Sequence, residues 1–314
     1  MFVASASIIA IKSILTEIGF KEIYDCFTLF KEVELDGLNY KWSNDQMSRS
    51  VTTHLKFVLR AYDMLPNDVI QTLNVGLTTR CTLRCRDCSQ YIPLIKNPKD
   101  YGCDKTIESI KILTSHFGYD IIELRISLAE ALIYKDLHIF LQKLRSIKNI
   151  ETIQVLTNGT VLPSTEVIDA LVADRRILVR WSNYGETSSK AHELVEILNR
   201  FYIRYEVTNH IFWVKHQEMT YQSLSKHELQ DKFLNCFCRV PTLIEGKLYY
   251  CFCEFLGEVL DVFDEKLSTA IDLLTPPNTI GEMLTRKTPI PACSYCYKVF
   301  REKLGNVPVA KQIT

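Results

Sequence analysis

The sequence predicts an α/β protein with a largely parallel sheet, arranged as a partial barrel. Between about residue 70 and residue 207, short runs of Ile, Val, Leu and aromatic residues alternate with helical patterns. Near-continuous apolar strands alternating with helices are typical of a parallel sheet with helices on its outer face. So few units do not close an eight-fold barrel. The expected strands are Val69–Val75, Ile121–Ile126, Thr152–Leu156, Ile177–Trp181 and Tyr202–Val207.

Helical periodicity fills the segments between these strands. Apolar residues three and four apart form one face over residues 137–147, 167–172 and 191–198. Ser164 stands where the second of these helices begins and is a good N-cap residue.

Four polar or thiol side chains each follow a strand candidate. They are Cys81, Glu130, Asn158 and Asn183. The carboxyl ends of parallel strands meet at one edge of a sheet, and the active sites of such folds lie there. We therefore expect these residues to converge.

Two further parts flank the barrel, which is expected over residues 69–234. Residues 1–68 are interpreted as a mainly helical extension, in which the apolar run Phe2–Ile11 belongs to a buried helix and is too short to span a bilayer. Residues 235–314 are expected to form a small domain with a β-hairpin turning at Gly246. Its arms are Thr242–Glu245 and Lys247–Cys251.

The composition is that of an ordinary soluble globular protein, with 47% hydrophobic and 24% charged residues. Basic and acidic side chains balance at 37 each, which gives no overall field to attract nucleic acid or an anionic membrane. The N-terminus lacks the basic segment that precedes a secretory signal. We therefore expect a cytoplasmic protein with reduced thiols.

The 11 cysteines are clustered rather than scattered. Three lie at 81, 85 and 88, four between 236 and 253, and two at 293 and 296. Clustered cysteines in a reducing compartment favour metal ligation over disulfides.

Cys81, Cys85 and Cys88 are separated by three and then two residues. A loop with this spacing can bind three corners of an iron–sulfur cubane and leave the fourth iron open to a ligand. Zinc is the main alternative, but a structural zinc site takes four protein ligands, and no fourth Cys or His is nearby. Structural thiols are the remaining interpretation.

This motif resembles the signature of the radical S-adenosylmethionine superfamily, in the loop after the first strand of a partial (β/α)6 barrel. The stretches Leu77–Cys81 and Arg84–Ser89 are similar to members found with carbohydrate or natural-product gene sets. The resemblance runs from about Leu73 to the C-terminus. It implies a [4Fe–4S] cluster on the three cysteines, with the amine and carboxylate of S-adenosylmethionine on the open iron.

One stretch departs from the superfamily. Where members carry Gly-Gly-Glu-Pro after the second strand, this chain has Leu128, Ala129, Glu130 and Ala131. Glycine at such a place usually serves close backbone approach or a positive φ. The substitution is harmless if φ stays negative and the Leu128 side chain points away; otherwise it weakens or abolishes cofactor binding.

The resemblance implies that Glu130 binds the cofactor, and it implies further cofactor-binding residues. Asn158, Ser182 and Asn183 end the third and fourth strands, and they are suitable partners for ribose hydroxyls or a carboxylate, or else simple turn residues. Many members place an aromatic residue before the third cysteine, against the adenine; here Asp87 stands there, and Tyr91 is the expected substitute unless it only packs.

The later cysteines resemble a twitch domain, a shortened SPASM-like auxiliary-cluster domain of the superfamily. The resemblance implies a second [4Fe–4S] cluster on Cys236, Cys251, Cys293 and Cys296, with a zinc ribbon as the rival. Cys238 and Cys253 could each replace a neighbour. Cys-Phe-Cys pairs on a strand point to one face, so a spare thiol becomes a candidate hydrogen donor to a substrate radical.

The resemblance implies an oxidoreductase that abstracts a hydrogen atom from a small polar substrate, such as a sugar or aminocyclitol. Dehydrogenation or epimerisation would follow, with an external reductant such as flavodoxin or ferredoxin. One alternative is epimerisation or cross-linking of a ribosomal peptide. The other is a non-catalytic iron–sulfur or zinc protein with a degenerate cofactor pocket.

Overall fold

The chain divides into two compact units, Met1–Gln71 and Thr72–Thr314. The computed structural model describes residues 2–3, 24–25, 68–215, 218–236, 238–276, 280–297 and 305–313. In the first unit, strands β1 (Phe2–Val3) and β2 (Tyr24–Asp25) pair in parallel. The helix expected over Phe2–Ile11 is therefore wrong at its start, because these backbone groups pair with another strand. The rest of the expected helical extension lies outside the described residues.

The second unit is built on an eight-stranded sheet in the order β11–β10–β9–β3–β4–β5–β6–β7. Strands β4 to β7 pair in parallel, and β3 pairs in parallel with β9, whereas β9, β10 and β11 are antiparallel. This confirms an α/β fold with a mostly parallel central sheet. The strands are β3 Val69–Val75, β4 Asp120–Ile126, β5 Ile150–Thr157, β6 Ile177–Asn183, β7 Tyr205–Asn209, β9 Thr242–Ile244, β10 Lys247–Tyr249 and β11 Ile271–Asp272.

Four of the five expected strands lie within two residues of their predicted bounds. The fifth, β7, begins at Tyr205 rather than Tyr202. Tyr202 has φ = 54° in the turn after a helix, which is a left-handed conformation that a strand does not accommodate.

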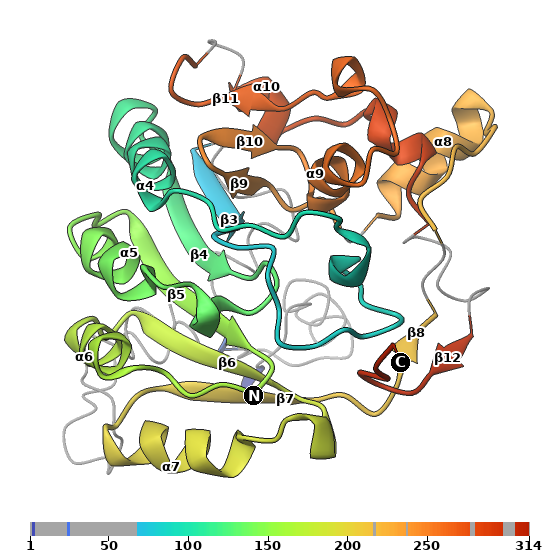
Figure 1. Ribbon diagram of the computed structural model, residues 1–314. Helices are drawn as coiled ribbons and strands as arrows, with labels where there is room; N and C mark the ends of the chain where they lie inside the picture. Colours follow the sequence, from blue (N-terminus) through green and yellow to red (C-terminus); the bar gives the residue numbers. More distant parts are fainter. Residues whose placement is uncertain are drawn as a thin grey trace. The chain divides into compact units, whose positions relative to one another are not determined.

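Four helices cover one face of the parallel strands (Figure 1). They bury the apolar faces that the sequence periodicity predicts, for example Leu194 and Leu198 of α7. Ser164 caps α6 as expected, accepting a hydrogen bond from the backbone N–H of Val167 at 3.4 Å. The helices are α4 Cys103–Lys111, α5 Leu137–Leu144, α6 Thr165–Ala173 and α7 Ala191–Arg200.

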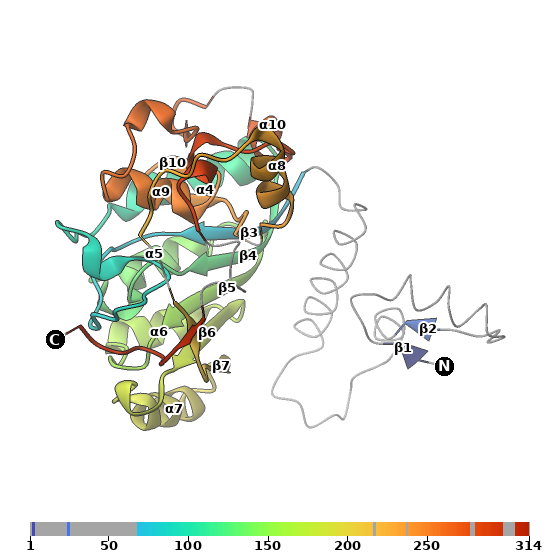
Figure 2. The same ribbon diagram turned by 90° about the vertical axis from the view of Figure 1, so that its right-hand side faces the viewer.

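The remaining helices lie near the hairpin end of the sheet (Figure 2). They are α8 Lys226–Leu234, α9 Phe252–Val259 and α10 Ile280–Leu284. A two-stranded sheet pairs β8 (Trp213–Val214) with β12 (Asn306–Val307). Among the helices that the structure describes, none is long and apolar enough to cross a membrane.

The predicted hairpin is confirmed by the antiparallel pairing of β9 with β10. Its turn residues Glu245 and Gly246 have φ of 47° and 95°, the positive values that a two-residue hairpin turn requires. The second arm ends at Tyr249 rather than Cys251, because Cys251 is already the N-cap of α9.

Candidate functional site

The three cysteines of the first motif lie on the loop that follows β3. Backbone hydrogen bonds fold this loop locally: the N–H of Cys88 donates to the carbonyl of Cys85 at 3.3 Å, and the N–H of Tyr91 donates to that of Cys88 at 2.9 Å. Before the motif, Thr79 and Lys99 exchange hydrogen bonds that fix the entry of the loop. The cysteines are thus held at the carboxyl end of β3, as predicted.

Hydrogen-bond donors point at the sulfurs of Cys81 and Cys85. Cys81 Sγ accepts from the Leu83 N–H at 3.4 Å and from Asn158 Nδ2 at 3.6 Å, and Cys85 Sγ accepts from Gln312 Nε2 at 3.3 Å. Burial outweighs these donors and raises the pKa of both thiols to about 11. Alone at neutral pH these thiols are therefore protonated, and a metal that binds them displaces the protons.

Glu130 joins the loops after three strands. Its carboxylate is fully buried and accepts from the backbone N–H groups of Leu132 at 3.1 Å and Asn158 at 2.8 Å. Its own N–H donates to the carbonyl of Arg80, next to Cys81. Burial raises the pKa of Glu130, which these backbone bonds oppose. Because both oxygens already accept hydrogen bonds, the observed role of Glu130 is to hold the site together.

Three of the four residues expected to converge do so: Cys81, Glu130 and Asn158 are linked by the bonds above. Asn183 is directed elsewhere. Its Nδ2 donates to Asn209 Oδ1 on β7 at 2.8 Å, and its Oδ1 accepts from the Gly185 N–H at 3.0 Å. Asn183 and Ser182 are the last residues of β6 rather than following the strand.

The two positions where the superfamily carries glycine behave differently. Ala129 has φ = 54°, in the left-handed region that favours glycine. Leu128 lies outside that region, and its side chain is 2% exposed. It packs over Gly76, where an added Cβ would meet Leu128 Cδ2 at 2.7 Å. Ala129 therefore keeps the positive φ although it is not a glycine, and Leu128 is part of the apolar interior.

The Gln90 side chain forms hydrogen bonds with backbone groups of this same loop. Its Nε2 donates to the carbonyl of Ser127, and its Oε1 accepts from the Ala129 N–H at 2.8 Å. The side-chain amide thus connects the cysteine loop to the loop after β4. No sequence pattern marked Gln90, since its partner lies 39 residues away.

Tyr184 lies near all three cysteines of the motif and is a site residue that sequence reasoning missed. Burial raises its pKa to about 12, opposed by a hydrogen bond with Ser182 and reinforced by the three thiols. Its ring contacts His210 and Trp213 at centroid distances of 5.4 and 5.2 Å. The Trp181–Gly185 stretch was the available signal, although only its Ser and Asn were selected.

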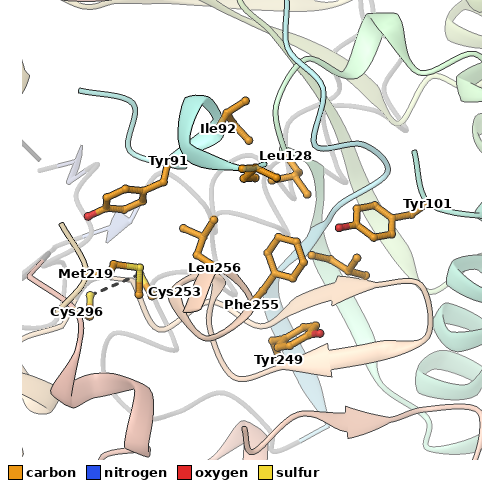
Figure 3. Close-up of a cluster of buried hydrophobic side chains, with 12 residues drawn as sticks. Tyr91, Ile92, Tyr101, Leu128, Met219, Tyr249, Cys253, Phe255, Leu256 and Cys296 are labelled. Carbon is orange, nitrogen blue, oxygen red and sulfur yellow. Dashed lines mark hydrogen bonds between the residues drawn. The ribbon is translucent and has the colours of Figure 1, made fainter. Parts of the chain in front are cut away.

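Tyr91 lies in a buried apolar cluster (Figure 3) together with Leu128, Phe255 and Leu256. It is 6% exposed. Cys81 and Cys88 pack against this cluster, and so does Cys251. Asp87 is also buried and pairs with Arg86 at 2.9 Å. An adenine-stacking role for Tyr91 remains a prediction.

Six later cysteines gather from three separate segments. Cys296 Sγ and Cys253 Sγ lie 3.5 Å apart, and both side chains are buried (Figure 3). A hydrogen bond with Cys238 lowers the pKa of Cys236 to about 7, whereas one with Cys253 raises the pKa of Cys251. Burial raises the pKa of Cys293 to about 11.

A buried lysine accompanies this second group. Lys232 on α8 is 4% exposed, and its Nζ donates to the carbonyl of Cys293 at 2.6 Å and to Gln222 Oε1 at 3.1 Å. Gln222 Nε2 in turn donates to the carbonyl of Cys296 at 3.2 Å. Burial lowers the pKa of Lys232, and the thiols of Cys296, Cys293, Cys236 and Cys253 oppose that shift.

The strand geometry assumed for the Cys-Phe-Cys pairs is wrong. Cys251 and Cys253 lie at the N-cap and in the first turn of α9, and Cys236 and Cys238 follow the end of α8. The period-two argument for a thiol facing the barrel therefore fails. Cys253 instead lies against Cys296.

The donor sets suit thiolate-bound metal centres. In the first group, N–H donors that stabilise a thiolate reach the sulfurs of Cys81 and Cys85. In the second group, a buried ammonium interacts electrostatically with the thiols of Cys236, Cys253, Cys293 and Cys296. Within the described residues, no three His, Cys, Asp or Glu side chains lie close enough together to hold a single metal ion.

No protein-family model matches the chain. Part of it is similar to GTP 3′,8-cyclases of Xanthomonas campestris pv. campestris, strains B100 and 8004, at 29% identity over 115 residues. The match covers 35% of this chain and 33% of each cyclase, so the chain spans about a third of the length of these relatives.

Solved structures also resemble the chain at low similarity. For anSMEcpe with bound AdoMet, the TM-score is 0.47 at 12% identity, over 70% of this chain and 81% of that chain. For BtrN in complex with AdoMet and 2-DOIA, it is 0.44 at 12% identity, over 75% and 87%. For Streptococcus suis SuiB, it is 0.37 at 14% identity, over 62% and 43%.

Proposed function

We propose that the chain is a radical S-adenosylmethionine enzyme with a partial (β/α)6 barrel and a twitch-like second cluster. The observation that carries the proposal is the position of Cys81, Cys85 and Cys88. They lie on one loop at the carboxyl end of β3, beside the Glu130 loop and Tyr184. Carboxyl ends of parallel strands are where such folds place their chemistry.

In this proposal the three thiols hold a [4Fe–4S] cluster with one open iron. A cluster held there would supply the electron for reductive cleavage of S-adenosylmethionine, and with it the means to remove a hydrogen atom from the substrate. Glu130 keeps the loops after β3, β4 and β5 in register, and Asn158 orients Cys81. The apolar cluster excludes water from one side of the cysteine loop.

We propose a small polar substrate, a sugar or aminocyclitol, because polar side chains surround the cysteine loop. Thr82 and Thr160 form an exposed hydroxyl pair, and Ser182 bonds to Tyr184 nearby. A second cluster would supply an acceptor for the further electron that is released, together with a proton, when an alcohol is oxidised to a ketone. Cys236, Cys251, Cys293 and Cys296 are the proposed ligands of that cluster, and an external flavodoxin or ferredoxin supplies the first electron.

The test is anaerobic reconstitution with iron and sulfide, followed by dithionite and S-adenosylmethionine. We expect 5′-deoxyadenosine, more of it with an aminocyclitol or sugar than with a peptide. Cys103→Ala should form as much 5′-deoxyadenosine as the wild type, since Cys103 is a buried thiol at the start of α4 outside both groups. If a peptide increased 5′-deoxyadenosine formation more than the small molecules did, the substrate would instead be a ribosomal peptide.

One observation favours a non-catalytic metal protein as the second candidate. Leu128 fills interior space, and Gln90 already bonds to Ser127 and Ala129 in the loop where the superfamily carries its two glycines. Protein that holds iron on the first motif yet forms no 5′-deoxyadenosine would establish this alternative.

A further inference from the structure

A segment distant in sequence lies along the first cysteine loop. We call residues 305–313 the strap; it is the red segment that ends at C in Figures 1 and 2. Its first part is fixed by β12, which pairs with β8, and by a 3.0 Å hydrogen bond from the Lys215 N–H to the carbonyl of Gly305. Trp213 of β8 contacts Tyr184, so the strap begins beside the site.

The second part of the strap pairs directly with the cysteine loop. Cys85 and Gln312 form an antiparallel β-bridge. The Ile313 N–H donates to the carbonyl of Arg84 at 2.7 Å, and the Arg86 N–H donates to that of Lys311 at 2.8 Å. Two backbone bonds flanking one residue fix the register, so the Gln312 side chain has a defined position over Cys85.

The Gln312 amide is oriented by partners at both of its ends. Oε1 accepts from the Arg84 N–H at 2.7 Å, while Nε2 donates to the Ala310 carbonyl at 2.6 Å and to Cys85 Sγ at 3.3 Å. The reverse orientation would set oxygen against the Ala310 carbonyl and nitrogen against an N–H, which excludes it. The group facing the sulfur is therefore an N–H donor.

We propose that Gln312 is a positioning residue that raises the reduction potential of the cluster on Cys81, Cys85 and Cys88. The inference rests on the proposed function, because it needs a cluster at the motif. Reduction adds negative charge that is shared by the ligand sulfurs. An N–H donor stabilises the reduced form more than the oxidised one, and such bonds are among the determinants of cluster potentials.

Two variants separate the sulfur contact from the folding of the strap. Gln312→Met has similar length and no donor. Gln312→Glu keeps an acceptor for the Arg84 N–H but sets a carboxylate oxygen against the sulfur. Lys311→Met is the control, because the Lys311 side chain is exposed and its backbone carbonyl remains.

The measurement is a redox titration of the reconstituted full chain, followed by electron paramagnetic resonance. We expect Gln312→Met to lower the reduction equilibrium constant of one cluster about tenfold, which is about 59 mV for one electron. Gln312→Glu should lower it at least as far, and Lys311→Met should not change it. The second cluster serves as an internal reference.

Unchanged potentials in both Gln312 variants, with iron retained on the motif, would overturn the inference and leave the proposed function intact. Wild-type protein that binds no iron at the motif would overturn both. Limited proteolysis of each variant, compared with Lys311→Met, checks that the strap stays in place.

Discussion

The two cysteine groups are built in different ways. The first is local: three thiols within eight residues, each on the same loop, with amide donors reaching two of the sulfurs from Asn158 and Gln312. The second is assembled from distant segments: Cys253 and Cys296 are hydrogen-bonded to each other, and the ammonium of Lys232 interacts electrostatically with four of the thiols. Neutral amides stabilise a thiolate without cancelling its charge, whereas a buried cation compensates that charge directly.

The difference indicates a division of roles. In the proposed function, three thiols on one loop would leave one side of a cluster open to a cofactor, and their surroundings provide hydrogen bonds. A group of six thiols has more donors than a cluster requires. Its buried cation favours a closed centre that carries negative charge. The apolar cluster with Leu128 and Cys253 packs against members of both groups.

The largest expected effect separates the two groups directly. Cys85→Ser should remove the iron of the first group and reduce 5′-deoxyadenosine formation to background, because the cofactor's iron is lost. Cys236→Ser should remove iron from the second group and leave cleavage of S-adenosylmethionine measurable. Iron per chain and 5′-deoxyadenosine are measured for both. Loss of cleavage in Cys236→Ser, with the first group's iron intact, would contradict the division of roles.

The next effect concerns the apolar cluster that both groups contact. Leu128→Ala should lower the free energy of unfolding by about 2–5 kcal/mol, since it opens a cavity under a 2% exposed side chain. Urea unfolding measures this loss. Leu94→Ala is the matched control at 53% exposure and should change stability by less than about 0.5 kcal/mol. Equal losses in the two variants would show that Leu128 is not a core residue.

The smallest effect tests the strain beside the first group. Ala129→Gly should raise the free energy of unfolding by about 1 kcal/mol, because a positive φ of 54° costs alanine about that much and glycine little. The shift in the urea midpoint measures it. Ala131→Gly, two residues on and without a positive φ, should instead destabilise by about 0.5–1 kcal/mol. A lower free energy of unfolding in both variants would show that the backbone of Ala129 is not strained.

Much of the fold followed from periodicity alone. Strands β3 to β6, the hairpin at Gly246 and the Ser164 cap depend on neighbours within a few residues, so local sequence predicts them. The start of the fifth strand was misplaced at Tyr202 because the turn after α7 depends on how that helix ends. The Cys-Phe-Cys pairs were misassigned since a short apolar run does not distinguish a strand from a helix start.

By itself the sequence determined the chemistry of the candidate ligands: three thiols at close spacing and a second thiol-rich region. It also showed a loop without the glycines that the resembled superfamily carries there. Only the tertiary structure decided what surrounds them. Gln312 reaches Cys85 across 227 residues, and Gln90 reaches Ala129 across 39. Contacts between residues so far apart in the sequence produce no local sequence pattern, because they depend on how whole elements pack. Likewise, only the folded backbone showed that Ala129 keeps a glycine's φ while Leu128 joins the core.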